Sequence, residues 1–141
     1  MDIILLGPEH IELAWPSVEP LLYKALDYSA GEWKPEDFKE NLLEGLIDLF
    51  IATKESRDTI VAMACTQVVH YPQYKSLRIN ALAGDSMGEW FDEETFEEHA
   101  QKKGCHSIEL FGRKGWLRVA DKKGYKEQYV VMTKVLESKG E

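Results

Sequence analysis

The spacing of apolar residues changes along the chain and predicts an alternation of strands and helices. Asp2–Leu6 is a short apolar run closed by Gly7 and Pro8, which predicts a strand. Apolar residues at helical spacing follow at Ile11, Ala14, Val18, Leu21, Leu22 and Ala25. Pro16 and Pro20 interrupt this stripe. It therefore predicts two short helices or one bent helix, with Pro20 near a first helical turn.

The next segments change from a helical period to short β-rich runs. Residues 35–46 predict a helix whose buried face contains Phe38, Leu42, Leu43 and Leu46. Three runs rich in β-branched and aromatic residues follow, at 48–53, 59–71 and 77–83. Polar turns separate these runs, so we expect an antiparallel meander.

The last third of the chain predicts a strand, helix and strand crossover. Ser86 and Glu89 form a capping-box pattern that begins a helix, and Gly104 is placed to end it. A strand at 105–111, a short helix at 116–122 and a last strand at 129–136 follow. The expected fold is an α/β sheet of mixed direction, in which segments 77–83 and 105–111 run parallel.

Composition narrows the possible functions. A chain of 141 residues with 44% hydrophobic side chains is expected to form one domain, over 1–138 with a frayed end at 139–141. A net charge of -8 disfavours nucleic acid as a partner. No apolar run is long enough for a membrane span, so we expect a protein of a reducing compartment. Cys65 and Cys105 lie in apolar runs as free thiols, and the histidines show no metal-ligand spacing.

The order of elements resembles the GNAT-type N-acetyltransferase fold over essentially the whole chain. More narrowly, several motifs look like small GNAT-like proteins of tailed phages and prophages: Trp15 with Val18 and Pro20-Leu21-Leu22, Gly45, Tyr71-Pro72, Ala83 to Trp90, Gly104-Cys105, and Gly112-Arg113-Lys114-Gly115-Trp116. This resemblance implies a protein of the host cytoplasm or the virion. It also implies a virion-associated or assembly role with a protein as partner.

In active members of the superfamily, the loop after the fourth strand reads Arg/Gln-x-x-Gly-x-Gly/Ala and holds the pyrophosphate of coenzyme A. Matching that pattern on Gly88 places Asp85 and Trp90 at the other two positions. A carboxylate repels phosphate, and an indole blocks close approach of the backbone. We therefore expect no bound cofactor. If acetyl coenzyme A does bind, the expected cradle is Leu82, Ala83, Gly84, Gly88, Arg113 and Lys114.

The resemblance also locates the catalytic acid, a tyrosine that protonates the departing thiolate. Counting back from Gly124 and Tyr125 places Ala120 at that position, and alanine carries no proton. Glu109 is the candidate general base, because a carboxylate inside an apolar strand needs an explanation. Its alternative role is an ion pair with Arg113 or another cation.

Two functions follow from these residues. The first is a GNAT-like protein without acetyl transfer that acts in assembly. The second is a divergent acetyltransferase that uses acetyl coenzyme A, with Glu109 as the base. An open cleft between the fourth and fifth strands would favour the enzyme, whereas a cleft filled by Trp90 or Trp116 would favour the binding protein. Trp116 is expected to be a core residue.

Overall fold

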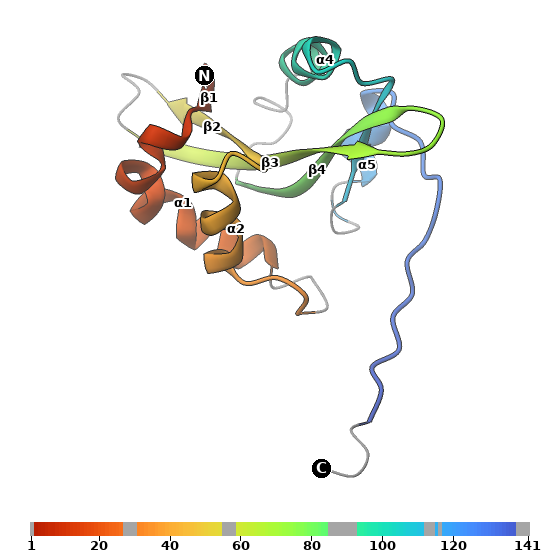
Figure 1. Cartoon of the computed structure of the whole chain (residues 1–141), viewed down its shortest axis with the longest axis horizontal. Helices are drawn as coiled ribbons and strands as arrows, with labels where there is room; N and C mark the ends of the chain where they lie inside the picture. Colours follow the sequence, from red (N-terminus) through yellow and green to blue (C-terminus); the bar gives the residue numbers. More distant parts are fainter. Residues whose placement is uncertain are drawn as a thin grey trace.

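The computed structural model describes residues 2–26, 31–54, 59–84, 93–111, 115 and 117–137. Five strands form one sheet in the order β1-β2-β3-β4-β5 (Figure 1). Their bounds are Asp2–Leu6, Asp48–Lys54, Thr59–His70, Lys75–Gly84 and Ser107–Leu110. Neighbouring strands are antiparallel except β4 and β5, which are parallel. The structure therefore confirms the mixed sheet and its parallel pair.

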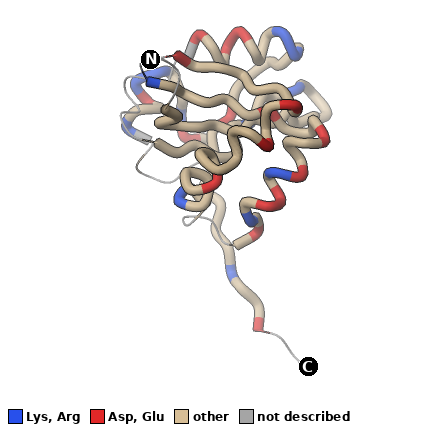
Figure 2. Tube along the Cα trace, turned by 90° about the vertical axis from the view of Figure 1, so that its left-hand side faces the viewer, with Lys and Arg blue, Asp and Glu red and all other residues tan. Residues whose placement is uncertain are grey.

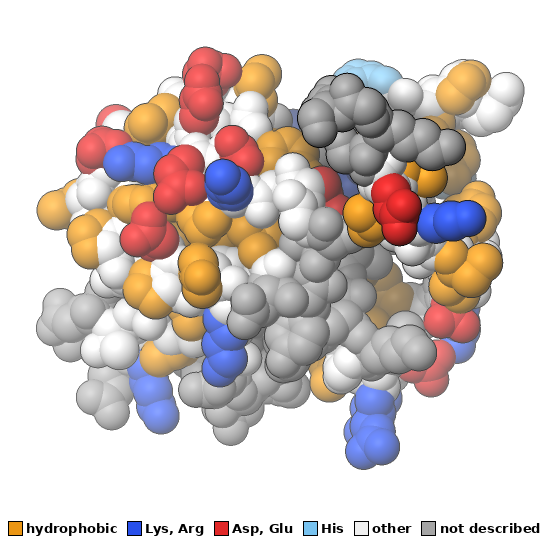
Figure 3. Space-filling model, turned by 90° about the horizontal axis from the view of Figure 1, so that it is seen from below, with side chains coloured by type: hydrophobic (Ala, Val, Ile, Leu, Met, Phe, Trp, Pro, Cys, Tyr) orange, Lys and Arg blue, Asp and Glu red, His pale blue; other side chains and the backbone are white. Residues whose placement is uncertain are grey.

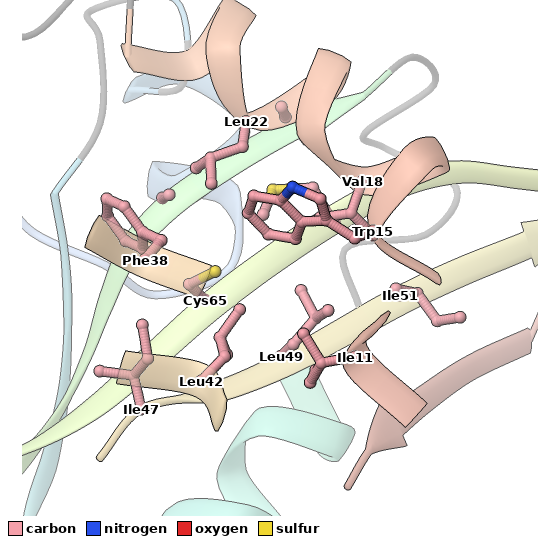
Figure 4. Close-up of a cluster of buried hydrophobic side chains, with 13 residues drawn as sticks. Ile11, Trp15, Val18, Leu22, Phe38, Leu42, Ile47, Leu49, Ile51 and Cys65 are labelled. Carbon is pink, nitrogen blue, oxygen red and sulfur yellow. The ribbon is translucent and has the colours of Figure 1, made fainter. Parts of the chain in front are cut away.

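Helices cover both faces of the sheet (Figure 1). On one face lie α1 (Ile11–Leu26), preceded by the short 3-10 helix η1 (Pro8–His10), and α2 (Pro35–Leu43). Their apolar side chains meet β2, β3 and β4 in a first core cluster that includes Trp15, Leu22, Phe38, Leu42, Leu49 and Met63 (Figure 4). On the opposite face α4 (Glu93–Lys102) inserts Phe96 into a second cluster. The last helix, α5 (Leu117–Lys122), contributes Val119 to that cluster.

The first helical stripe forms a single helix rather than two. Pro16 and Pro20 both lie inside α1, so the placement of Pro20 near a first turn is wrong. Each interior proline costs about 3 kcal/mol. The buried residues Ile11, Val18 and Leu22 keep one helical phase against the sheet. Their burial, at roughly 1.5–3 kcal/mol per side chain, offsets the cost of the prolines.

The second helix ends earlier than its apolar stripe predicts. Gly45 has a positive φ of 76°, and the Leu46 N–H donates to the Asn41 carbonyl in a helix-terminating turn. Leu46 is consequently 62% exposed, and Leu43 is exposed as well. The expectation that both lie on the buried face is wrong. The chain turns before Leu46, and within the helix only Phe38 and Leu42 are buried. Ile47 occupies the core instead.

The crossover helix ends as predicted. Gly104 has a φ of 74°, and the Cys105 N–H donates to the Ala100 carbonyl. The capping box of Ser86 and Glu89 lies outside the described residues, as does the expected start of this helix before 93. No helix in the described part of the chain is long and apolar enough to cross a membrane.

The predicted last strand is wrong. Residues 129–136 are extended but form no strand in the structure, and their apolar side chains are exposed. Figure 2 shows this end of the chain leaving the body of the protein. The apolar composition is typical of a strand, but a strand also needs a neighbouring strand to accept its hydrogen bonds. The sequence also predicts Tyr125 as a core aromatic that closes a last hairpin; it does pack against the second core cluster, but residues 129–136 form no such hairpin.

Candidate functional site

A groove of about 1810 Å³ borders the β4 and β5 edge of the sheet. It extends from Lys24 and Trp33, near the ends of the first two helices, to α5 and the chain after it. Figure 3, viewed from the side of α1 and α2, shows hydrophobic side chains interspersed with charged ones on this face. The candidate base Glu109 lines this groove.

Three side chains at the groove form a connected group, which we call the carboxylate cluster: Tyr71, Arg78 and Glu109. The Arg78 Nε donates to Glu109 Oε2 at 2.8 Å. The Tyr71 hydroxyl lies 2.8 and 3.0 Å from the two carboxylate oxygens, and the Arg78 Nη2 donates to that hydroxyl at 3.2 Å. The Arg78 guanidinium also lies 4.3 Å from the centre of the Phe111 ring. Both carboxylate oxygens are therefore engaged.

The strand register explains why these groups meet. Arg78 and Glu109 are direct partners across the parallel pair of β4 and β5, so their side chains project from the same face of the sheet. Tyr71 follows the end of β3 directly. The sequence identified Glu109 as a carboxylate that needs a partner, and the structure supplies Arg78. The expected alternative partner, Arg113, lies outside the described residues.

The pKa of Glu109 follows from competing effects. Burial raises the pKa, but the hydrogen bonds from Arg78 and Tyr71, together with the charge of Arg78, lower it by more. The net result is a pKa below its ordinary value. A carboxylate with a lowered pKa and two engaged oxygens is a weak proton acceptor, which disfavours the role of general base.

The face of the sheet around the carboxylate cluster is polar. The Ser107 hydroxyl donates to the Ser76 hydroxyl at 3.1 Å, and the Asn80 side-chain amide donates to Gln67 at 3.0 Å. A register shift between β3 and β4 lies beside Asn80, because consecutive β3 residues pair with Ala81 and then Ile79. This irregularity separates the apolar part of the face, under α1, from the polar part at the groove.

The strands β4 and β5 pair over only part of the length of β4. Their register ends at Ile79 opposite Leu110, and the Phe111 N–H donates to the Ile79 carbonyl. Beyond this point β4 continues to Gly84, paired with β3 only, within the described residues. The enzyme interpretation requires an open cleft at this point, but the chain that follows β5 lies largely outside the described residues. The competing feature, a cleft filled by Trp90 or Trp116, concerns residues outside the described part.

The cradle expected for acetyl coenzyme A is described only in part. Leu82 and Ala83 are buried, with their side chains in the second and first core clusters respectively. Gly84 has a φ of 138°, and a Cβ there would lie 2.3 Å from the Ala62 Cβ. The close approach of β3 therefore accounts for this glycine without a ligand. The other expected members of the cradle, Gly88, Arg113 and Lys114, lie outside the described residues. The structure therefore does not describe the part of the cradle that would hold the phosphates.

The residue at which the resemblance places the catalytic acid is buried. Ala120 lies in α5 and is buried, and its carbonyl accepts hydrogen bonds from the N–H groups of Lys123 and Tyr125. No proton donor can arise from this side chain.

On the α4 side of the sheet, His99 Nε2 and Asp48 Oδ2 lie 3.1 Å apart, a pair that the sequence did not indicate. Hydrogen bonding to His99 lowers the pKa of Asp48.

Comparison with known proteins supports the fold. No protein-family model and no curated protein sequence matches the chain. Among solved structures, a probable acetyltransferase has a TM-score of 0.71 and 14% identity, with all of both chains covered. The ribosomal-protein-alanine N-acetyltransferase of Brucella melitensis has a TM-score of 0.70 and 11% identity over 96% of this chain and 100% of its own. The glucosamine-6-phosphate N-acetyltransferase of Arabidopsis thaliana has a TM-score of 0.65 and 16% identity over 96% and 98%. The chain therefore has the fold of the GNAT-type N-acetyltransferases.

Proposed function

We propose that this chain is a GNAT-fold protein that does not transfer acetyl groups and acts by binding another protein. The observation that carries this proposal is the carboxylate cluster. Arg78 and Tyr71 occupy the Glu109 carboxylate and lower its pKa. An amine substrate would have to displace both partners before Glu109 could accept its proton.

The helix after β5 supports the same proposal. Ala120 stands where the resemblance places the acid, and although it borders the groove, its methyl side chain is buried and carries no proton to donate. Tyr125, the nearest tyrosine along the chain, lies five residues beyond that position, where it packs against the second core cluster at the margin of the groove. The candidate base is thus held by other side chains, and the position of the acid carries no proton donor.

A divergent acetyltransferase is the second candidate, and one observation favours it. The edge of β4 after Ile79 has no β5 partner in the described residues. Such an edge offers backbone groups to an extended ligand. In this case acetyl coenzyme A would lie along Leu82 and Ala83, and Glu109 would have to exchange its partners for water or substrate.

Two measurements separate the candidates. Calorimetric titration with acetyl coenzyme A should give a dissociation constant weaker than about 10 μM. Coenzyme A release in the presence of a panel of primary amines should not exceed the rate without protein. If release does occur, Glu109→Gln should be compared with Glu97→Gln, an exposed carboxylate that also lines the groove. Release that is lost only in Glu109→Gln would establish the acetyltransferase and refute our proposal.

The resemblance suggests where such a protein would act. A phage or prophage origin, a place in the host cytoplasm or virion, and a virion or assembly component as partner all stay predictions.

A further inference from the structure

The end of the molecule at the β3–β4 hairpin differs in charge from the rest of the chain. Residues 70–78 and 99–106 contain three lysines and one arginine but no aspartate or glutamate. These two stretches carry a net charge of +4, and the rest of the chain carries -12. Figure 1 shows the hairpin at one end of the sheet. The protein therefore has a basic end in an otherwise acidic molecule.

The parallel pair of β4 and β5 brings the two basic stretches together. The His106 N–H donates to the Lys75 carbonyl at 2.8 Å, directly before Ser76 pairs with Ser107. A Cβ at Gly104, in the turn after α4, would lie 3.1 Å from Lys75 Nζ. Lys75 therefore lies beside the last turn of α4, where the helix dipole favours a cation.

The lysines of this end have no carboxylate partner among the described residues. Lys75, Lys102 and Lys103 form none of the ion pairs in that part of the chain, and Lys102 and Lys103 are exposed. The carboxylates at the margin of this end, Glu109 and Asp48, are already paired with other side chains. The three ammonium groups are therefore open to an anion from another molecule.

Three aromatic rings lie in contact beside these lysines. Tyr71 is 39% exposed and Tyr74 44%, and their ring centres are 5.7 Å apart. The exposed His106 ring lies 4.8 Å from the Tyr74 ring. The Tyr71 N–H donates to the Tyr74 carbonyl at 2.9 Å, and the Tyr71 hydroxyl donates to Glu109. These bonds fix the rings in advance, which lowers the entropy lost when a partner binds.

We call Tyr71, Tyr74, Lys75, Lys103 and His106 the basic aromatic surface. Its charge favours an anionic partner, and its rings offer contact area to apolar side chains, as tyrosines do in protein interfaces. Nucleic acid is disfavoured, because a long polyanion would extend from this surface over the rest of the chain, with its net charge of -12. A short acidic segment of a protein can contact this surface alone.

We infer that the basic aromatic surface binds an acidic segment of another protein. The carboxylates of that segment meet Lys75 and Lys103, and its apolar side chains pack on Tyr74 and His106. The inference gives the chemistry of the partner in the protein-binding function proposed above and rests on that proposal.

Fluorescence anisotropy with a labelled acidic peptide tests the inference. The probe is a ten-residue peptide of glutamates interrupted by two phenylalanines and one leucine, used at low ionic strength, where charges are weakly screened. The full chain should bind it with a dissociation constant below about 100 μM. Lys75→Glu/Lys103→Glu should weaken binding at least about tenfold. The matched control Lys54→Glu/Lys134→Glu makes the same change in net charge at exposed lysines elsewhere and should weaken binding less than about threefold.

A second variant tests the rings without changing the charge. Tyr74→Ser should weaken binding of the peptide at least about fivefold, because the central ring of the surface is lost. The control Tyr23→Ser removes an exposed tyrosine of α1 and should leave binding unchanged. Replacing every glutamate of the probe with glutamine should abolish binding.

Several results would overturn the inference: no binding of the acidic peptide, equal binding of the glutamine peptide, or equal losses in a variant and its control. Tighter binding of a single-stranded oligonucleotide that Lys75→Glu/Lys103→Glu abolishes would also overturn it, because the partner would then be a nucleic acid. The same holds for a doubled mass of the chain alone in light scattering that this variant abolishes, since a second copy would then occupy the surface. Acetyl transfer by a chain that binds the peptide would refute the proposed function and leave this surface intact. Absence of both peptide binding and acetyl transfer would overturn only the inference.

Discussion

Replacing Arg78 with methionine tests the interpretation of the carboxylate cluster. The substitution removes the guanidinium but retains an unbranched stem near Phe111. Glu109 then keeps the hydrogen bonds of Tyr71 and Ser76 but no cation, in a partly buried position, its side chain being 24% exposed. Leaving a buried group without its partner costs about 1–3 kcal/mol. The exposure of both side chains places the expected loss of unfolding free energy near the lower end, at about 1 kcal/mol.

The dependence of this loss on pH is the sharper test. The pKa of Glu109 is lowered in the folded protein from an ordinary value of 4.5, so the carboxylate stabilises the fold above that value. This contribution disappears as the pH falls through the lowered folded-state pKa. In Arg78→Met the folded-state pKa should rise. The destabilisation should therefore be greatest near pH 7 and should shrink once the pH falls below about 4.5.

Urea denaturation of the original chain and the variant, at neutral and acid pH, provides the measurement. Lys126→Met is the control, because it removes an ion pair whose two side chains are 71% and 69% exposed. It should leave the denaturation midpoint unchanged at either pH. A loss in Arg78→Met that is the same at both pH values, or that does not exceed the control, would show that Arg78 does not hold the Glu109 carboxylate as described.

Three further predictions concern the packing. Gly84→Ala should destabilise the protein by more than about 1 kcal/mol, because its Cβ would overlap β3; Gly124→Ala, with a similar positive φ and open space, should cost less, and the two denaturation midpoints compare them directly. Phe96→Ala should lower the unfolding free energy by about 3–5 kcal/mol, since this ring is fully buried in the second core cluster, and a loss below about 1 kcal/mol would contradict that placement. In the folded protein iodoacetamide should modify Cys105 before Cys65, because the Cys65 thiol is completely buried and burial raises its pKa. Mass spectrometry of the time course measures this order, and modification of Cys65 first would contradict the prediction.

Much of the architecture was predictable because it depends on local patterns. The spacing of apolar residues, the turn residues and the order of elements predicted the antiparallel meander and the parallel pair of β4 and β5. The structure contains both. The pattern was misleading where tertiary contacts opposed it. Pro16 and Pro20 remain inside one helix because its buried face is long and in phase. Leu46 is exposed because Gly45 turns the chain first.

The candidate site was predictable only through Glu109. A carboxylate in an apolar strand shows that a partner is needed, but not which cation provides it. Arg78 carries a similar signal, as a charge within the apolar run 77–83, and joining the two signals requires the register between strands. Tyr71 carried no comparable signal, since an aromatic residue at a strand end is common.

The sequence by itself determined the α/β class and the order of elements, because each depends on residue type at a local spacing. Tertiary structure decided which groups meet. It paired Glu109 with Arg78 through the register of β4 and β5, and it ended that register at Ile79. It also left residues 129–136 without a strand partner, although their composition is that of a strand. The physical reason is that a side chain's own preference is local, whereas hydrogen-bond partners, burial and open edges depend on segments distant in the chain.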